Sequence, residues 1–331
     1  MVVGPNSRKI AGRAYRSWQI VQRSGHSALQ ILVTGKHGQL ARCLADRAVV
    51  YSDVRLRFAA REGAEFYLDM ADEASIRSAV KRISPDIIIN AAAYTAVDKA
   101  EDEPDLAHQI NGTAPGTLAQ EAELLGIPIL HVSTDYVFSG DLDRPYLPED
   151  QVNPQSVYGA SKLLGEENVR AATDRHAIVR TAWVHSPYGT NFPKTMLRLA
   201  ETRDEISVVD DQIGNPTEAH DIADALLQLA QVTTGKPAVG LGETFHFAGP
   251  ESMSWCDFAK RVLADVTGPS GKPMVVNPIT TADYPTKAKR PANSRLDRTK
   301  FDDLKKLQTR SRTEREKPLA GYHYGTRASG N

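Results

Sequence analysis

The chain has 331 residues, of which 41% are hydrophobic and 24% are charged, with 23 glycines and 19 prolines. This composition is that of an ordinary globular protein, and it excludes a disordered chain, a collagen-like repeat and a disulfide scaffold. The length suits one large α/β domain or two smaller lobes. No apolar run approaches the ~20 residues of a transmembrane helix, so no membrane partner is expected.

The formal net charge of −1 is unevenly distributed along the chain. Residues 1–28 carry five basic residues and no acid, and residues 304–331 carry seven basic residues and two acids. The body between them is therefore acidic, which is not the profile of a nucleic-acid-binding domain. We interpret 1–28 as a basic, disordered arm, with a transit peptide or an upstream-extended start as alternatives, and 304–331 as a basic, disordered tail.

Apolar, β-rich runs alternate with helical patterns along the first half of the chain. The expected strands are 29–34, 54–58, 86–90, 127–132 and 177–184. The expected helices are 38–48, 72–83, 104–125 and 157–172. Strands and helices that alternate in this way predict βαβ units, and hence a Rossmann-like, doubly wound parallel sheet over 29–184.

The pattern loosens after residue 184, in a region rich in Pro and Asn. Helices are expected near 192–202, 219–231 and 254–266, with short strands near 206–209 and 243–247. We interpret 185–303 as mainly a smaller, substrate-binding lobe. The two cysteines, Cys43 and Cys256, lie far apart and outside any CxxC motif, which favours free thiols in a reducing compartment such as the cytoplasm.

A glycine turn follows the first strand and opens the first helix. It reads Thr34-Gly35-Lys36-His37-Gly38-Gln39-Leu40-Ala41. Small residues here let backbone N–H groups and the helix N-terminus approach a pyrophosphate, as in dinucleotide sites. The alternative is a tight turn without a ligand.

Tyr158 and Lys162 are four residues apart at the start of a predicted helix, so both side chains project from one face. Ser133, Thr134 and Asp135 follow the strand 127–132, at a carboxyl end of the predicted sheet. An ammonium beside a tyrosine stabilises the phenolate and lowers the pKa of the phenol. Thr134 would hold a substrate carbonyl while Tyr158 protonates it, and the alternative is an exposed helix pair.

These segments together resemble a known family. The segments that carry the resemblance are TGxxGQL, NAAAYTAVDKAE at 90–101, STDYVF at 133–138, YGASK at 158–162 and RTAWVHS at 180–186. They are similar to the extended short-chain dehydrogenase/reductases, and within them to the dTDP-4-dehydrorhamnose reductase family. The resemblance implies an oxidoreductase that reduces the C4 ketone of dTDP-4-dehydro-L-rhamnose to dTDP-L-rhamnose in polysaccharide biosynthesis. Tyr158 would be the proton donor.

The resemblance also implies roles for individual residues. Lys162 would hold the nicotinamide ribose, and Thr134 takes the place of a serine in many relatives. The implied cofactor contacts are Gly35, Gly38, Gln39, Leu40, Asp69, Met70, Ala92, Ala93, Tyr94 and Thr95, besides Tyr158 and Lys162. The implied substrate contacts are Thr134, Asp135, Trp183, Asn191, Arg290 and Arg295. The end of the chain departs from the family because it lacks a final apolar helix.

The choice between NADPH and NADH depends on the end of the second strand. NAD enzymes usually place an acid there, whereas this chain places Arg61, and a guanidinium suits a 2′-phosphate. NADPH is therefore the favoured cofactor, with NADH as the alternative. No His or Cys cluster has ligand spacing, so no metal ligands are predicted, although Mg²⁺ is an expected stimulant by resemblance.

Other functions stay open at this point. Four basic residues flank a Pro-rich loop, and they suit either a diphosphate or a solvated basic surface: Lys287, Lys289, Arg290 and Arg295. Gln212, Asn215 and Thr217 are further candidate polar contacts for the sugar. The alternatives are a reductase or epimerase of another nucleotide sugar, and a catalytically silent subunit like the regulatory β subunit of methionine adenosyltransferase. A homodimer is one expected assembly.

Overall fold

The apolar runs of the sequence form one parallel sheet in the computed structural model, which describes residues 28–309. Its strands are β1 (Leu29–Thr34), β2 (Val54–Ala60), β3 (Phe66–Tyr67), β4 (Ile87–Asn90), β5 (Ile129–Thr134), β6 (His176–Thr181) and β11 (Glu243–His246). Their order is β11-β6-β5-β4-β1-β2-β3, and all neighbours are parallel. The Rossmann-like sheet is confirmed. The order reverses between β1 and β4, where such folds bind ligands at the carboxyl ends of the strands.

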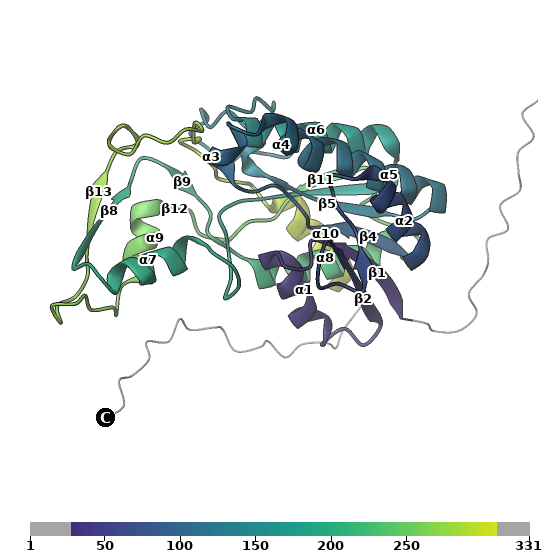
Figure 1. Ribbon diagram of the computed structural model, residues 1–331, viewed down its shortest axis with the longest axis horizontal. Coiled ribbons are helices and arrows are strands. Elements are labelled where there is room, and N and C mark those ends of the chain that lie inside the picture. Colours follow the sequence, from purple (N-terminus) through teal and green to yellow (C-terminus); the bar gives the residue numbers. More distant parts are fainter. Residues whose placement is uncertain (1–27, 310–331) are drawn as a thin grey trace, which may run out of the picture.

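Helices cover both faces of this sheet (Figure 1). They are α1 (Gln39–Ala48), α2 (Glu73–Ile83), α3 (Val97–Ala100), α4 (Pro104–His108), α5 (Ala114–Leu125), α6 (Val157–Ala172), α8 (Ala219–Thr233) and α10 (Thr299–Thr309). One face buries Leu44, Leu226 and Phe301 from α1, α8 and α10. The other buries Leu118 and Val169 from α5 and α6. The apolar faces of these helices therefore hold the sheet between two layers.

Capping residues define where several of these helices begin. Ser156 precedes α6, and its side chain accepts a hydrogen bond from the Gly159 amide at 3.1 Å. Asp72 caps α2 in the same way through the Ala74 amide. These side chains satisfy backbone donors that a helix N-terminus leaves free. The bounds of α6 agree with the predicted helix 157–172.

The predicted helix 104–125 contains a π-helical turn, Gln109–Thr113, between α4 and α5. Gly112 lies in this turn and packs against α6, because a Cβ there would lie 2.6 Å from Cδ2 of Leu164. The wider turn also carries Asn111, which is fully buried. A π-helical turn inside an α-helix often marks a functional position.

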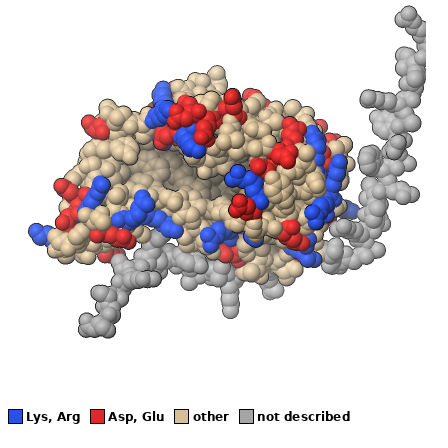
Figure 2. All heavy atoms as spheres, viewed as in Figure 1, with Lys and Arg blue, Asp and Glu red and all other residues tan. Residues whose placement is uncertain are grey.

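The second part of the molecule has its own small core. Its elements are α7 (Phe192–Ala200), β8 (Glu205–Val209), α9 (Trp255–Val262), β13 (Val275–Ile279) and the short strands β7 (Val184–His185), β9 (Ile213–Gly214), β10 (Thr217–Glu218) and β12 (Met253–Ser254). Met196, Ile206, Cys256 and Leu263 pack together there. Figure 2 shows a hollow in the surface between this part and the sheet.

Two expectations for the second half of the chain need correction. α8 and β11 fall inside 185–303, but they pack on and extend the central sheet, so that range is interrupted by elements of the first part. The tail predicted to be disordered from residue 304 is helical to Thr309 as part of α10. Phe301 meets the rings of Phe245 and Phe247 edge-on, so a final helix does close the sheet. The expectations for residues 1–27 and 310–331 lie outside the described residues.

Candidate active site

The glycine turn after β1 brings two segments of backbone into close contact. Gly35 has a φ of +76°, and a Cβ there would lie 2.9 Å from Cα of Ala92. Only glycine combines this conformation with this approach. Gly38 precedes α1 as its N-cap and has no side chain to accept hydrogen bonds from the first amides of the helix. Those N–H groups are thus available to an anion at the switch point of the sheet.

The next two residues of the turn differ in what they offer. Leu40 is buried in the core, so its backbone rather than its side chain is free to face a ligand. The Gln39 carboxamide oxygen accepts hydrogen bonds from Ser186 at 2.8 Å and from Asn191 at 2.9 Å. Gln39 therefore connects the start of α1 with the segment after β7.

The segment after β4 is fastened to the glycine turn. The Thr34 hydroxyl donates to Asn90 at 2.7 Å and accepts from the Ala92 amide at 3.1 Å. Ala93 follows, and Thr95 is exposed. The Tyr94 hydroxyl donates to Glu103 at 2.7 Å. The polar pairs hold this loop beside the turn, and the predicted passage of the loop beneath a cofactor stays a prediction.

Tyr158 and Thr134 lie close together at the carboxyl edge of the sheet. Tyr158 is in the first turn of α6, and Thr134 is the last residue of β5. Burial raises the pKa of Tyr158 to about 12, while a hydrogen bond with Thr134 opposes the rise. The Thr134 hydroxyl donates to Asp135 at 2.9 Å, and burial raises the pKa of that carboxyl to about 6. A protonated phenol at neutral pH suits a proton donor.

Lys162 lies one helical turn after Tyr158, as the spacing predicts. It is almost fully buried, and its ammonium donates to the Val132 carbonyl at 2.7 Å. Burial lowers the pKa of Lys162 to about 8, and the Glu166 carboxylate opposes this effect. Since Lys162 is bound to β5 here, its effect on the pKa of Tyr158 stays a prediction.

Two buried residues near Tyr158 and Lys162 were not predicted from the sequence. Asn111 accepts from the Tyr94 amide at 2.8 Å and donates to Ser161 at 3.0 Å, so it joins the loop at Tyr94 to α6. Glu166 pairs with Arg180 at 2.7 Å. An Asn-Gly pair inside a predicted helix was a usable signal for Asn111, because both residues disfavour helices. The sequence does not distinguish Glu166 from an acidic residue on the surface of a helix.

Arg61 follows β2 directly and is exposed. The loop that holds it contacts the glycine turn: His37 Nε2 lies 2.8 Å from the Glu62 carbonyl, and Lys36 donates to the Gly63 carbonyl. The predicted adenine-side residues follow β3. The Asp69 carboxylate accepts from the Ala71 amide at 2.9 Å, and Met70 is buried.

The predicted substrate residues are engaged with other parts of the protein. Trp183 has a φ of +48° and stacks on Trp255, with ring centroids 3.4 Å apart. Arg290 pairs with Asp98 at 2.7 Å. Arg295 donates to Asn293 at 2.8 Å.

The remaining polar candidates have partners too. Asn191 caps α7 and also donates to the Ser186 carbonyl at 2.7 Å. Lys287 pairs with Asp102, and Lys289 donates to Gln155. Gln212 donates to Thr281, Asn215 donates to the Gly249 carbonyl, and Thr217 donates to the Asn215 carbonyl. A substrate that bound these residues would have to displace some of these contacts.

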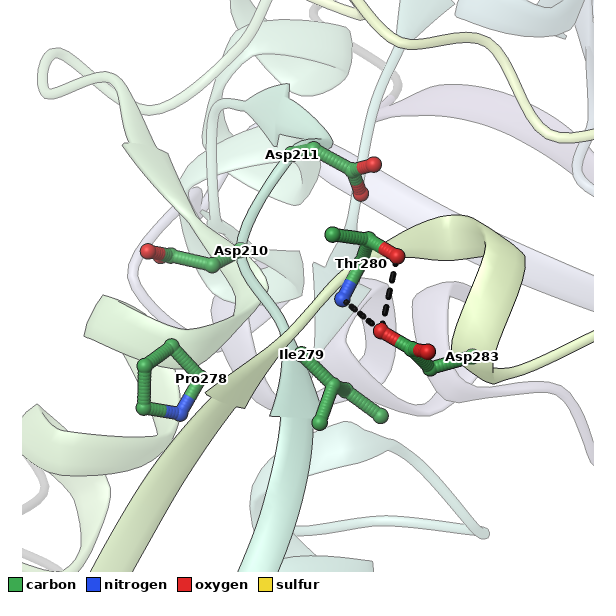
Figure 3. A pocket seen from close by; sticks show the side chains of 6 residues that line it. All are labelled: Asp210, Asp211, Pro278, Ile279, Thr280 and Asp283. Atoms are coloured by element: carbon green, nitrogen blue, oxygen red, sulfur yellow. Dashed lines mark hydrogen bonds between the residues drawn. The ribbon is translucent and has the colours of Figure 1, made fainter.

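A surface pocket of about 330 Å³ lies at the carboxyl ends of β8 and β13 (Figure 3). Asp210, Asp211 and Asp283 contribute carboxylates to it. Each of them accepts hydrogen bonds, from Ser254, Thr281 and Thr280 respectively. The pocket contains none of the predicted catalytic residues, so it does not compete with the switch point as the active site.

Within residues 28–309, no helix combines the length and apolar character needed to cross a membrane. One group of side chains in this part of the chain has the composition of a metal site: Cys43, Asp46 and His220. Cys43 and Asp46 are neighbours on α1, but His220 lies on α8, 174 residues after Asp46 in the sequence. Spacing alone therefore gave no sign of the group.

Comparison with known proteins agrees with this geometry. The model of the RmlD substrate binding domain family matches residues 29–319. A dTDP-4-dehydrorhamnose reductase of Sinorhizobium fredii is 45% identical over 81% of this chain and 88% of its own length.

Two solved structures of dTDP-4-dehydrorhamnose reductases have the same fold. The one from Clostridium acetobutylicum is 38% identical, with a TM-score of 0.74 over 84% of this chain and 92% of the other. The one from Bacillus anthracis, solved in complex with NADP, is 34% identical, with a TM-score of 0.76 over 84% and 93%. The chain therefore belongs to the dTDP-4-dehydrorhamnose reductase family.

Proposed function

We propose that this protein reduces the C4 ketone of dTDP-4-dehydro-L-rhamnose to give dTDP-L-rhamnose, with NADPH as the preferred reductant. The observation that carries the proposal is the group formed by Thr134, Tyr158 and Lys162 at the carboxyl edge of the sheet. Thr134 ends β5, the strand next to β4, and Tyr158 and Lys162 lie on α6, which packs beside β5. The glycine turn follows β1, on the other side of β4. A carbonyl and a nicotinamide bound there would share one site.

The residues at the switch point fit a dinucleotide. The close approach of Gly35 to Ala92 leaves no room for a side chain, and the uncapped amides of α1 suit a pyrophosphate. When bound, the nicotinamide supplies the hydride that C4 receives. Lys162 would hold the nicotinamide ribose, and Asn111 would keep the loop at Tyr94 in place.

The protein's own side chains supply the proton. Thr134 donates a hydrogen bond to the substrate carbonyl in place of its present bond to Asp135. Tyr158 then transfers its phenolic proton to the same oxygen as negative charge develops there. The raised pKa of Tyr158 keeps that proton in place until the substrate arrives. The Lys162 ammonium, which is charged below its pKa of about 8, favours the phenolate that remains.

The proposal is tested by the loss of reduced-nicotinamide absorbance with enzymatically generated dTDP-4-dehydro-L-rhamnose, and by identifying the product. Tyr158→Phe should lower kcat by about 10²- to 10⁴-fold, because it removes the proton donor. Cofactor binding should stay within about twofold, since a hydroxyl alone is lost. Tyr51→Phe, in which the lost hydroxyl contacts Asp224 near α8, is the control.

Three outcomes would overturn parts of this assignment. Full activity of Tyr158→Phe would show that Tyr158 is not the proton donor. Faster turnover of another 4-keto nucleotide sugar would change the substrate. Tight cofactor binding without turnover of any such sugar would favour the silent-subunit alternative. The two buried free thiols, Cys43 and Cys256, support a cytoplasmic setting for the reaction.

A further inference from the structure

A cluster of one buried and two partly buried side chains lies at the contact between α1 and α8, outside the proposed active site. Cys43 and Asp46 project from α1, and His220 projects from the first turn of α8. The thiol sulfur, one carboxylate oxygen and one ring nitrogen all lie within 4.8 Å of one another. His220 Nε2 is 2.9 Å from Asp46 Oδ2.

From this juxtaposition, we propose that Cys43, Asp46 and His220 bind a divalent transition-metal ion of the zinc class. Thiolate, imidazole and carboxylate are the ligands that zinc takes in proteins, whereas Mg²⁺ favours oxygen ligands alone. Tetrahedral zinc places its ligand atoms roughly 3.5 Å apart. The present separations are therefore within a small side-chain movement of that geometry, with water in the fourth position.

Each ligand has a second partner that would orient it. Glu218 Oε1 lies 3.4 Å from Nδ1 of His220, so it can accept the Nδ1 proton while Nε2 faces the ion. The Tyr188 hydroxyl donates to Asp46 at 2.7 Å. The Ser186 side chain beside Cys43 lowers the pKa of the thiol and so favours its thiolate. Carboxylate–histidine pairs of this kind fix the tautomer at zinc sites.

The charges around the cluster favour a cation. Burial raises the pKa of the Cys43 thiol, and the carboxylates of Asp46 and Glu218 add to the rise, which brings the pKa to about 12. Arg42 opposes them, but its guanidinium lies over the Tyr188 ring, 3.8 Å from the centroid. A divalent ion would displace the thiol proton, and binding would therefore release a proton. The same high pKa argues against Cys43 as a nucleophile.

The position of the cluster gives the ion a structural role. Ser186 also donates to Gln39, the first residue of α1 after the glycine turn. A bound ion would join α1, the segment at 186–188 and α8. It would thereby stabilise the turn that receives the cofactor, without touching the substrate.

Cobalt(II) is the most direct probe, because a cysteine thiolate bound to cobalt gives a near-ultraviolet charge-transfer absorption. The metal-stripped full-length chain should bind one equivalent and show this absorption. Cys43→Ala should abolish it, and Cys256→Ala, which removes the other buried cysteine, should retain it. Glu218→Gln should weaken binding by about 10- to 100-fold.

Thermal unfolding supplies a second readout. Zinc should raise the melting temperature of the stripped chain and of Cys256→Ala, but not that of Cys43→Ala or Asp46→Asn. Cofactor binding by each variant reports whether it has folded. No cobalt–thiolate absorption, or an equal absorption in Cys43→Ala, would overturn the proposal, as would an equal zinc-induced shift in all variants.

Discussion

The two sides of the proposed active site are built in different ways. On the sheet side, the cofactor turn is made of backbone and small residues such as Gly35 and Ala92, whose close approach leaves no space to fill. On the predicted substrate side, the candidate contacts are long side chains that already have partners in the protein, such as Trp183 on Trp255 of α9 and Arg290 on Asp98 of α3. Under the proposed function, the first side needs no rearrangement to receive its ligand, and the second would have to exchange its partners.

This difference implies that substitutions on the two sides should act on different quantities. Changes at the sheet edge remove a chemical group or close a preformed space, so they should affect kcat or cofactor binding. Changes on the other side alter a competition between intramolecular and substrate contacts, so they should mainly move the substrate KM.

The largest effect is expected from Lys162. Lys162→Met should lower kcat by about 10²- to 10⁴-fold, because the phenolate of Tyr158 loses its cation. In the wild type, kcat should fall as pH rises through about 8, the pKa of the buried ammonium. A pH profile of kcat checks this.

Two controls sharpen this prediction. Lys162→Arg keeps its charge at high pH and should move the alkaline limb upward. Lys81→Met, which changes an exposed lysine of α2, should leave the profile unchanged. An alkaline limb at the same pH in Lys162→Arg would assign it to another group.

The next effect is expected at the glycine turn. Gly35→Ala should weaken cofactor binding by at least about 10-fold, since a left-handed alanine costs about 1–2 kcal/mol and its Cβ meets Ala92. Gly126→Ala is the matched control, because its φ of +66° is similar and its Cβ would meet nothing within 4 Å. Fluorescence titration with NADPH measures both. Equal loss in the two variants would trace the effect to backbone strain alone.

Local patterns could be predicted from the sequence, whereas contacts made by tertiary packing could not. The glycine turn and the Tyr158–Lys162 pair are local patterns, and a parallel sheet brings its strand ends to one edge, so their placement followed from the order of the elements. Asn111 and Glu166 act through contacts with other segments, Ser161 and Arg180, that no spacing reveals, although the Asn-Gly pair marked Asn111 as unusual in a helix. Cys43 and His220 meet only because α1 packs on α8.

The end of the chain illustrates another limit. The segment from residue 304 looked too polar and basic to form a helix, yet α10 needs only a few apolar contacts at its start. Phe301 and Leu304 supply them by packing on the core that contains Phe245 and Phe247. Tertiary packing of two or three side chains outweighed the low hydrophobicity of the segment.

A smaller effect is expected from Arg290 and its partner. Arg290→Ala should raise the KM for the nucleotide sugar by about 10-fold, with kcat changed much less, if the guanidinium binds the diphosphate. Asp98→Asn should lower that KM by no more than about fivefold, because a partly exposed ion pair stabilises by only about 0–1 kcal/mol. Opposite shifts in steady-state KM would show the exchange of partners. Parallel increases would mean that the pair acts only as a structural contact.

The smallest effect is expected at Arg61, on the preformed side but at its exposed rim. A solvated guanidinium beside a 2′-phosphate contributes about 1 kcal/mol, so Arg61→Ala should raise the KM for NADPH by about fivefold. The KM for NADH, which lacks that phosphate, should be unchanged. Salt should reduce the difference, because the contact is screened. Arg55→Ala, which removes an exposed arginine within β2, is the control. Equal changes in the KM values of both cofactors would mean that Arg61 only shapes its loop. The choice between NADPH and NADH would then be made by Lys36 or His37, which contact the same loop from the glycine turn.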